Sequence, residues 1–288
     1  MITKLLRLRS VDNLVGKRRD YPMIWRLKDI SISTGTGFFS GFLAGLVGIG
    51  GAELRIAFLM NALKVPIREM VYANLMMSLM VSSSSFVVRL SSGVFSGQAA
   101  FLALAMIVGS LPGGYLGAIF SHRISERKLK VFLALMLSIV ILRLLMDFFV
   151  ATPDSTVRLP LLLEIPLSIF FGFVIGMIAG GIGVAGGEYR IPILIFVFGF
   201  PITIAGTVSQ LVSIPTILIA LLKHRAKMKG LFTKRTRIIV ISMGLSSVLA
   251  VILSTLVLLT VSSEVIRVVF VGILLYTTVQ LVRSIKKA

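Results

Sequence analysis

The chain lacks cysteine altogether and is poor in charged residues. Without cysteine it forms no disulfide, no thiolate metal site and no cysteine nucleophile. Charged residues make up only 14% of its 288 residues, whereas a soluble domain carries about a quarter. Hydrophobic residues make up 57%, and apolar runs of about 20 residues recur, as is typical of transmembrane helices. We therefore predict an all-α polytopic membrane protein.

Groups suited to catalysis or metal binding are scarce. The chain has two histidines, His122 and His224, and both fall in basic segments that we expect to be cytoplasmic loops. No His/Asp/Ser or metal-ligand constellation falls within the apolar runs, and no Walker motif follows a glycine-rich segment. The sequence thus predicts no enzyme, no catalytic residue, no metal site and no nucleotide-driven pump.

Basic residues are in large excess, with 30 Lys and Arg and a net charge of +19. In a soluble protein this excess indicates a nucleic-acid partner, but in a membrane protein cytoplasmic Lys and Arg orient the chain. We favour the second interpretation, with membrane lipid and not nucleic acid as the partner. Residues 1–28 hold eight basic residues and no uninterrupted apolar stretch, so residues 1–29 are predicted to be a basic cytoplasmic tail and not a cleaved signal peptide.

The remainder of the chain is a duplication. When the sequence is shifted along itself without a gap, so that Gly37 falls on Gly172, glycines, a Glu, an Arg, a Pro–Ile pair and a Ser coincide. We call this displacement the repeat shift. This set is too specific for chance matches in apolar sequence. We predict a first repeat over 30–150, an external linker over 151–165 and a second repeat over 166–288. The matched residues are Gly37/Gly172, Gly41/Gly176, Gly45/Gly180, Gly48/Gly183, Gly51/Gly186, Glu53/Glu188, Arg55/Arg190, Pro66/Pro201, Ile67/Ile202 and Ser78/Ser213.

The basic residues also indicate how each repeat crosses the membrane. If the segment 30–63 crossed once, the basic loop 122–130 would lie outside, against the positive-inside rule. If the segment instead enters, turns and leaves on its own side, this loop, the loop 223–237 and both termini are cytoplasmic. That topology places 24 of the 30 Lys and Arg inside and four outside. Each repeat is then a re-entrant helical hairpin plus three transmembrane helices, and the two repeats are inverted.

Two glycine-rich segments form the predicted tips of the hairpins, GLVGIGGAELR (45–55) and GGIGVAGGEYR (180–190). Their glycines are too dense for a good helix and suit a turn with positive φ. The glycines upstream, spaced four apart, predict close helix packing. A second half-helix is expected to begin near Ala52 and near Gly187. Its free N–H groups would face a buried cavity, as an anion site requires.

Each tip carries a Glu-x-Arg pair, Glu53 with Arg55 and Glu188 with Arg190. An ionised group at the bilayer centre costs about 2.5–3.5 kcal/mol, so these charges need a reason. Two readings stay open. Either each Arg merely neutralises a Glu and fixes the tip, or Arg attracts an anionic substrate while Glu holds Arg or carries a proton. Proton coupling is therefore left open, and no other cofactor is predicted.

Polar side chains follow each tip on the next predicted span, where they serve as interhelical contacts or line a cavity. The serine run 82–85 is interpreted as packing or helix-end polarity. The predicted substrate-binding residues combine the two tips with these polar positions. They are Gly50, Gly51, Glu53, Arg55, Asn74 and Ser78 in the first repeat and Gly186, Gly187, Glu188, Arg190, Ser209, Gln210 and Ser213 in the second.

Through these paired motifs the chain resembles the sulfite exporter TauE/SafE family of membrane permeases, over about residues 30–285. GLVGIGGAELRIAFL and GGIGVAGGEYRIPIL are similar to the two glycine-rich motifs of the family, one in each half. Two features depart from the family pattern: Ala57 stands where a proline is usual, as kept in Pro192, and Glu-x-Arg is not the commonest form. The resemblance implies transport of sulfite, a sulfonate or a related sulfur-containing or organic anion, and the departures leave the identity of the anion open.

Together these features predict a secondary transporter, expected to be an exporter, in the cell (inner) membrane. Its small anionic substrate would bind near the midplane between the two hairpin tips. An anion channel, or an importer of a different sulfur oxyanion or carboxylate, would be built from the same parts. A homodimer is a further assembly that the sequence leaves open.

Overall fold

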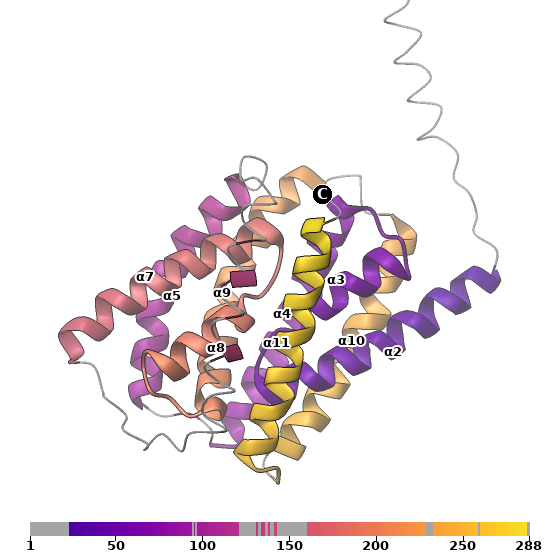
Figure 1. Ribbon diagram of the computed structural model, residues 1–288. Helices are drawn as coiled ribbons and strands as arrows, with labels where there is room; N and C mark the ends of the chain where they lie inside the picture. The colour runs from indigo at the N-terminus through magenta and orange to yellow at the C-terminus, as the bar shows by residue number, and fades with distance from the viewer. Residues whose placement is uncertain are drawn as a thin grey trace, which may run out of the picture.

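The computed structural model describes residues 23–120 except 94 and 96, scattered residues between 131 and 142, and residues 160–286 except 229–232 and 259. Its regular elements in these ranges are all helices (Figure 1). The helices are α2 (Met23–Val47), α3 (Ala52–Asn61), α4 (Ile67–Ser91), α5 (Gly97–Phe120), α7 (Leu161–Ile182), α8 (Gly187–Phe196), α9 (Ile202–Met228), α10 (Lys234–Leu258) and α11 (Ser263–Lys286).

Six of the described helices are long and apolar enough to cross a membrane, namely α2, α4, α5, α7, α9 and α10. At a rise of about 1.5 Å per residue, a helix of about 20 residues spans the hydrocarbon layer. Helices α3 and α8 have 10 residues each, which is about half that length. The chain is therefore an all-helical, multi-pass membrane protein.

The glycine-rich segments break the helices at the predicted places. Helix α2 ends at Val47 and α3 begins at Ala52, while α7 ends at Ile182 and α8 begins at Gly187. The glycines in both breaks adopt positive φ, a conformation that a side chain disfavours. Their φ values are 88° at Gly48, 60° at Gly51, 83° at Gly183 and 77° at Gly186. The two breaks thus share one conformation, and the bounds of α3 fall on those of α8 under the repeat shift.

The helices pack in an order that reads the same in both halves. Helix α2 packs on α10, α10 on α4, α4 on α9, α9 on α5 and α5 on α7. Figure 1 shows α5 beside α7 on one side of the molecule and α2 beside α10 on the other. Under the repeat, α2 corresponds to α7 and α4 to α9. Helices α2 and α7 therefore each pack on a helix of the other repeat.

Glycine allows close packing at the two contacts between repeats, α2 with α10 and α7 with α5. A Cβ at Gly37, Gly41 or Gly45 would collide with backbone or side-chain atoms of α10, and one at Gly172, Gly176 or Gly180 would collide with the backbone of α5. The residue numbers of the contacted positions on α10 rise together with those of the glycines on α2, so these two helices run parallel. The same holds for α5 and α7. The α10 neighbours are, in order, Met243 and Ser246, then Ser247, then Val251 and Ser254. The prediction of close helix packing at these glycines is confirmed.

Helices α4 and α9 cross in opposite chain directions. Arg89, near the end of α4, bonds Thr203 at the start of α9, while Leu75 lies in one cluster with Ala220 near the end of α9. A second cluster contains Leu59 of α3, and Ile32 near the start of α2 packs against that cluster. The two helix breaks lie against these crossing helices, because a Cβ at Gly48 would collide with Gly206 of α9 and one at Gly183 with Val71 of α4.

The starts of α2, α4 and α10 lie together at one end of the molecule. Arg235 of α10 donates to both carboxylate oxygens of Asp29 of α2, at 2.5 and 2.9 Å. Glu69 of α4 accepts hydrogen bonds from Thr233 at 3.2 Å and Thr236 at 2.5 Å. These contacts join segments that the sequence assigns to a single side of the membrane.

Several predictions fall on residues outside the described ranges. They concern the tail before residue 23, the loop 122–130 and most of the linker 151–165. The end of that linker is described, and it belongs to α7, which begins at Leu161. The sequence predicts His224 in a loop, but this residue lies within α9.

Candidate functional site

The two helix breaks meet each other inside the protein. A Cβ added at Gly50 would collide with the Cβ of Ala185, and one at Gly187 would lie 3.0 Å from the Cα of Ile49. All four residues are buried. The site predicted from sequence therefore has its two halves in backbone contact, and glycine at positions 50 and 187 is what permits that approach.

Arg55 holds the first tip against α4. Its Nη2 donates to the carbonyl oxygen of Gly50 at 2.6 Å and to Ser78 Oγ at 2.7 Å. Its Nε donates to Asn74 Oδ1 at 3.3 Å. Asn74 in turn donates from Nδ2 to the carbonyl oxygen of Gly183, in the second break, at 2.9 Å. Arg55, Asn74 and Ser78 of the predicted site thus form one network that joins both tips.

Arg190 occupies the equivalent place in the second repeat. It is fully buried, and its Nη1 donates to Ser213 Oγ at 2.8 Å and to the carbonyl oxygen of Ser209 at 2.9 Å. The Arg-to-Ser contact of the first repeat therefore recurs in the second. Unlike Nη1, the Nε and Nη2 of Arg190 have no hydrogen-bond partner among the described residues. A fully buried guanidinium thus retains N–H donors that the described protein groups do not use.

Glu188 does not neutralise Arg190. Its side chain is buried, and its Oε2 has no hydrogen-bond partner among the described residues. No ion pair joins it to Arg190 in the described structure, because Arg190 uses Ser209 and Ser213 instead. At the second tip the described structure thus shows no ion pair between Glu188 and Arg190, and the choice between the two interpretations stays a prediction. Glu53 lies in the first turn of α3, but its side chain is outside the described part of the structure.

Two further predicted residues, Ser209 and Gln210, are adjacent on α9, and the first of them lies beside the start of α8. Ser209 Oγ would be 3.3 Å from a Cβ at Gly187, so this hydroxyl faces the helix N-terminus. Neither Ser209 Oγ nor the amide atoms of Gln210 find a hydrogen-bond partner among the described residues, although both side chains are fully buried. Buried polar groups are normally satisfied. Such a concentration of unsatisfied groups is what a polar binding site would contain.

Sequence reasoning missed Arg89, which the predicted topology counts among the external basic residues. The structure buries it completely. Its Nη2 donates to the carbonyl oxygens of Gly45 and Leu46 in the last turn of α2, at 2.6 and 3.0 Å. The sequence feature that could have drawn attention to Arg89 is the repeat, since Arg89 falls on another basic residue type, His224, under the repeat shift. Neither residue belongs to the set of predicted binding residues.

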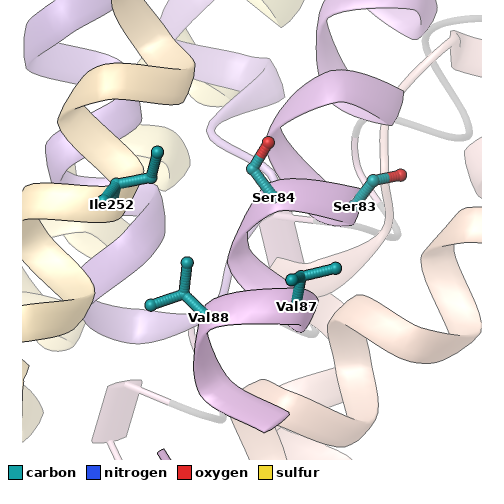
Figure 2. Close-up of a pocket in the computed structure, with 5 residues that line it drawn as sticks. All are labelled: Ser83, Ser84, Val87, Val88 and Ile252. Carbon is teal, nitrogen blue, oxygen red and sulfur yellow. The ribbon is translucent and has the colours of Figure 1, made fainter. Parts of the chain in front are cut away.

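A pocket of about 300 Å³ lies away from the tips, on the opposite face of α4 (Figure 2). Ser83, Ser84, Val87 and Val88 of α4 line it, and Ile252 of α10 stands across from them. Val87 is largely exposed, so the pocket opens on the apolar outer surface. Its lining offers an anion no cationic group, and we do not assign it to the site.

No cluster of three or more His, Cys, Asp or Glu side chains suited to a metal ion occurs in the part of the chain that the structure describes.

A comparison with models of protein families identifies the family of the chain. The model of the sulfite exporter TauE/SafE family matches residues 5–144 and 168–288. The chain belongs to this family.

Membership in the sulfite exporter TauE/SafE family confirms the resemblance noted from the glycine motifs. It supports the prediction of a membrane transport protein and is consistent with the absence of enzymatic function. Searches of curated proteins and of solved structures found no match. The residues that bind the substrate must therefore be argued from the geometry of this chain.

Proposed function

We propose that the protein is a secondary transporter that exports sulfite or a related sulfur-containing or organic anion across the cell membrane. The substrate binds where the two hairpin tips meet, at the N-terminus of α8. The observation that carries this proposal is the pair of unused Arg190 donors, Nε and Nη2, on a side chain with no exposed surface. Family membership supports transport of such an anion.

The balance of buried charge favours an anion. Arg55, Arg89 and Arg190 are fully buried around the tips, whereas Glu188 is the buried carboxylate that the structure describes there. Burying a charge is costly unless a partner compensates it. A bound anion supplies that compensation, and a planar guanidinium can present two N–H groups to two oxygens of a sulfur oxyanion.

The surroundings of Arg190 complete an oxyanion site. Ser209 Oγ faces the start of α8, where the first backbone N–H groups of a helix are free and the helix dipole is positive. Gln210 follows on α9 with an amide that has no partner in the described structure. These are neutral donors, which suit a small anion whose charge Arg190 already balances.

We infer that the two repeats are inverted in the membrane. The antiparallel crossing of the equivalent helices α4 and α9 supports this arrangement, and so do the parallel pairs α2/α10 and α5/α7. Both hairpins then enter the membrane from opposite sides and leave on the side of entry, with both termini cytoplasmic. This places the binding site near the midplane, as in other transporters with inverted repeats.

Glu188 is the proposed proton carrier. An anion that docks at Arg190 adds negative potential beside a buried carboxylate whose Oε2 has no partner among the described residues. A proton carried by Glu188 would then move together with the anion. A negative-inside potential drives an uncoupled anion outward by about 2.3 kcal/mol per charge per 100 mV, which agrees with export.

Flux from proteoliposomes tests the proposal. Vesicles are loaded with sulfite, thiosulfate, sulfoacetate, taurine or a dicarboxylate, and efflux is compared with that from vesicles holding the Arg190→Gln variant. We expect efflux of at least one sulfur-containing anion, lost in the variant. Currents far above carrier turnover would identify an anion channel instead, and vesicles that release none of the panel would overturn the proposal.

A further inference from the structure

One face of α4 carries a continuous row of polar side chains. Its members recur at intervals of three or four residues, which places them on a single side of the helix. All of them are fully buried, so the row faces the protein interior. The row begins at the central site and ends near the far end of α4. Its members are Asn74, Ser78, Ser82, Ser85 and Arg89.

The first two members belong to the Arg55 network described above, but the rest do not. Ser82 Oγ and Ser85 Oγ have no hydrogen-bond partner among the described residues. Ser82 lies beside the first tip, since its Oγ would be 3.9 Å from a Cβ at Gly50. The unsatisfied hydroxyls therefore start next to the central site and continue away from it.

Arg89 closes the row with a buried cationic side chain. Its bonds go to neutral acceptors, the carbonyl oxygens of Gly45, Leu46 and Thr203 and the hydroxyl of Thr207. No carboxylate pairs with it in the described structure, and its Nε has no partner there. Arg89 lies four residues after Ser85 on the same helix face, and its guanidinium ends against α2 and the start of α9.

The equivalent face of α9 is different. Under the repeat shift, Ser82 and Ser85 correspond to Ile217 and Ala220. These two pack with Leu75 and Ala185 in an apolar cluster. The hydroxyls of Ser82 and Ser85 thus occur in one repeat only, and they do not follow from the symmetry of the fold. A purely structural role, common to both halves, would not require them.

We propose that Ser82, Ser85 and Arg89 form a second oxyanion site, beside the central one and further toward the end of α4. The two hydroxyls and Arg89 Nε are its donors, and the guanidinium supplies its charge. This inference rests on the proposed function, since it places a second station on the route of the transported anion. The apolar cluster of Ile217 and Ala220 closes the corresponding route along α9.

The four serines 82–85 form an inward pair and an outward pair on one helix, and these pairs provide a matched test. Ser82→Ala with Ser85→Ala removes the inward hydroxyls, which make no hydrogen bond within the described structure, so the double variant should unfold at or above the wild-type temperature. Ser83→Ala with Ser84→Ala removes hydroxyls that line the outer pocket in Figure 2. The measurement is equilibrium binding of radiolabelled thiosulfate and sulfite to the purified full chain.

We expect the wild type and the Ser83/Ser84 variant to bind two anions per chain. The Ser82/Ser85 variant should bind one as before and the other about five- to a hundredfold more weakly, the loss expected for two hydrogen bonds. Arg190→Gln should remove the other site and leave this one. If the Ser82/Ser85 variant binds like the wild type while Arg190→Gln binds less, the second site is refuted and the proposed function stands. A wild type that binds no anion overturns both.

Discussion

Arg89 and His224, which correspond under the repeat shift, contact the carbonyl oxygens of two glycines that correspond in the same way. Arg89 Nη2 donates to the carbonyl oxygen of Gly45 at 2.6 Å, and His224 Nε2 lies 3.3 Å from that of Gly180. Each long helix therefore reaches the carbonyl end of the hairpin arm in its own repeat. A cationic side chain at that end of a helix also interacts favourably with the helix dipole.

Arg89 is expected to contribute strongly to stability. Arg89→Met removes the donor that Arg89 gives to the carbonyl oxygens of Gly45 and Leu46, and a buried unsatisfied polar group costs about 1–3 kcal/mol. The variant should therefore unfold well below the wild type in detergent. Arg89→Lys, which keeps the charge but not the planar fork, should fall between them. Arg267→Met on α11 is the control, and an equal effect of the two Met variants would contradict this role.

The glycine contact between α5 and α7 should tolerate no side chain. A Cβ at Gly113 would collide with the backbone of Phe173, whereas one at Gly35 of α2 would meet nothing within 4 Å. We expect Gly113→Ala to destabilise the protein by about 1–3 kcal/mol through overpacking. Gly35→Ala should stabilise it by up to about 1 kcal/mol through helix propensity. Thermal unfolding of both variants measures the difference, and equal melting temperatures would refute the close contact.

Labelling of single cysteines tests the topology, and the absence of native cysteine makes the chain suitable for it. Ser125→Cys should react with a membrane-impermeant reagent only from the cytoplasmic side, and Ser155→Cys only from outside. These positions flank residues 131–149, a largely apolar stretch that the sequence predicts to cross the membrane. Labelling of both from the outside would be incompatible with re-entrant hairpins and inverted repeats.

Glu188→Gln should separate proton coupling from anion binding. The variant removes a buried charge whose Oε2 has no partner in the described structure, so the fold should be preserved or slightly stabilised. Efflux should lose its dependence on a pH gradient while the anion still binds. Since Glu53 occupies the equivalent position, the double variant with Glu53→Gln is measured as well. Full pH-gradient dependence in the double variant would exclude both glutamates as carriers.

The two helix breaks could be predicted from sequence because their cause is local. Only glycine adopts positive φ readily, so clusters of glycine at 48–51 and 183–187 marked the ends of α2 and α7 and the starts of α3 and α8 to within a residue. The duplication supported the same prediction, since equal residues at equal spacing fold alike. Close packing at every fourth glycine followed from the helix period.

The partner of each helix could not be predicted in this way. The spacing of Gly37, Gly41 and Gly45 shows that they share a face, but it does not show that the face packs on α10 of the other repeat. Arg89 was misplaced for a related reason. A basic residue two positions before the end of a span normally reaches the interface, and only the fold reveals that the end of α2 lies close enough to bind it.

Arg190 is the central residue of the proposed anion site, and one binding measurement tests its role directly. Equilibrium binding of radiolabelled sulfite or thiosulfate is compared for the wild type, Arg190→Gln, Arg190→Lys and the charge-matched control Arg267→Gln. If the anion occupies the unused donors Nε and Nη2, Arg190→Gln should weaken binding at the central site about a hundredfold or more, because two charge-assisted hydrogen bonds are lost. Arg190→Lys should give an intermediate loss and Arg267→Gln none. Unchanged binding by folded Arg190→Gln would contradict the central claim.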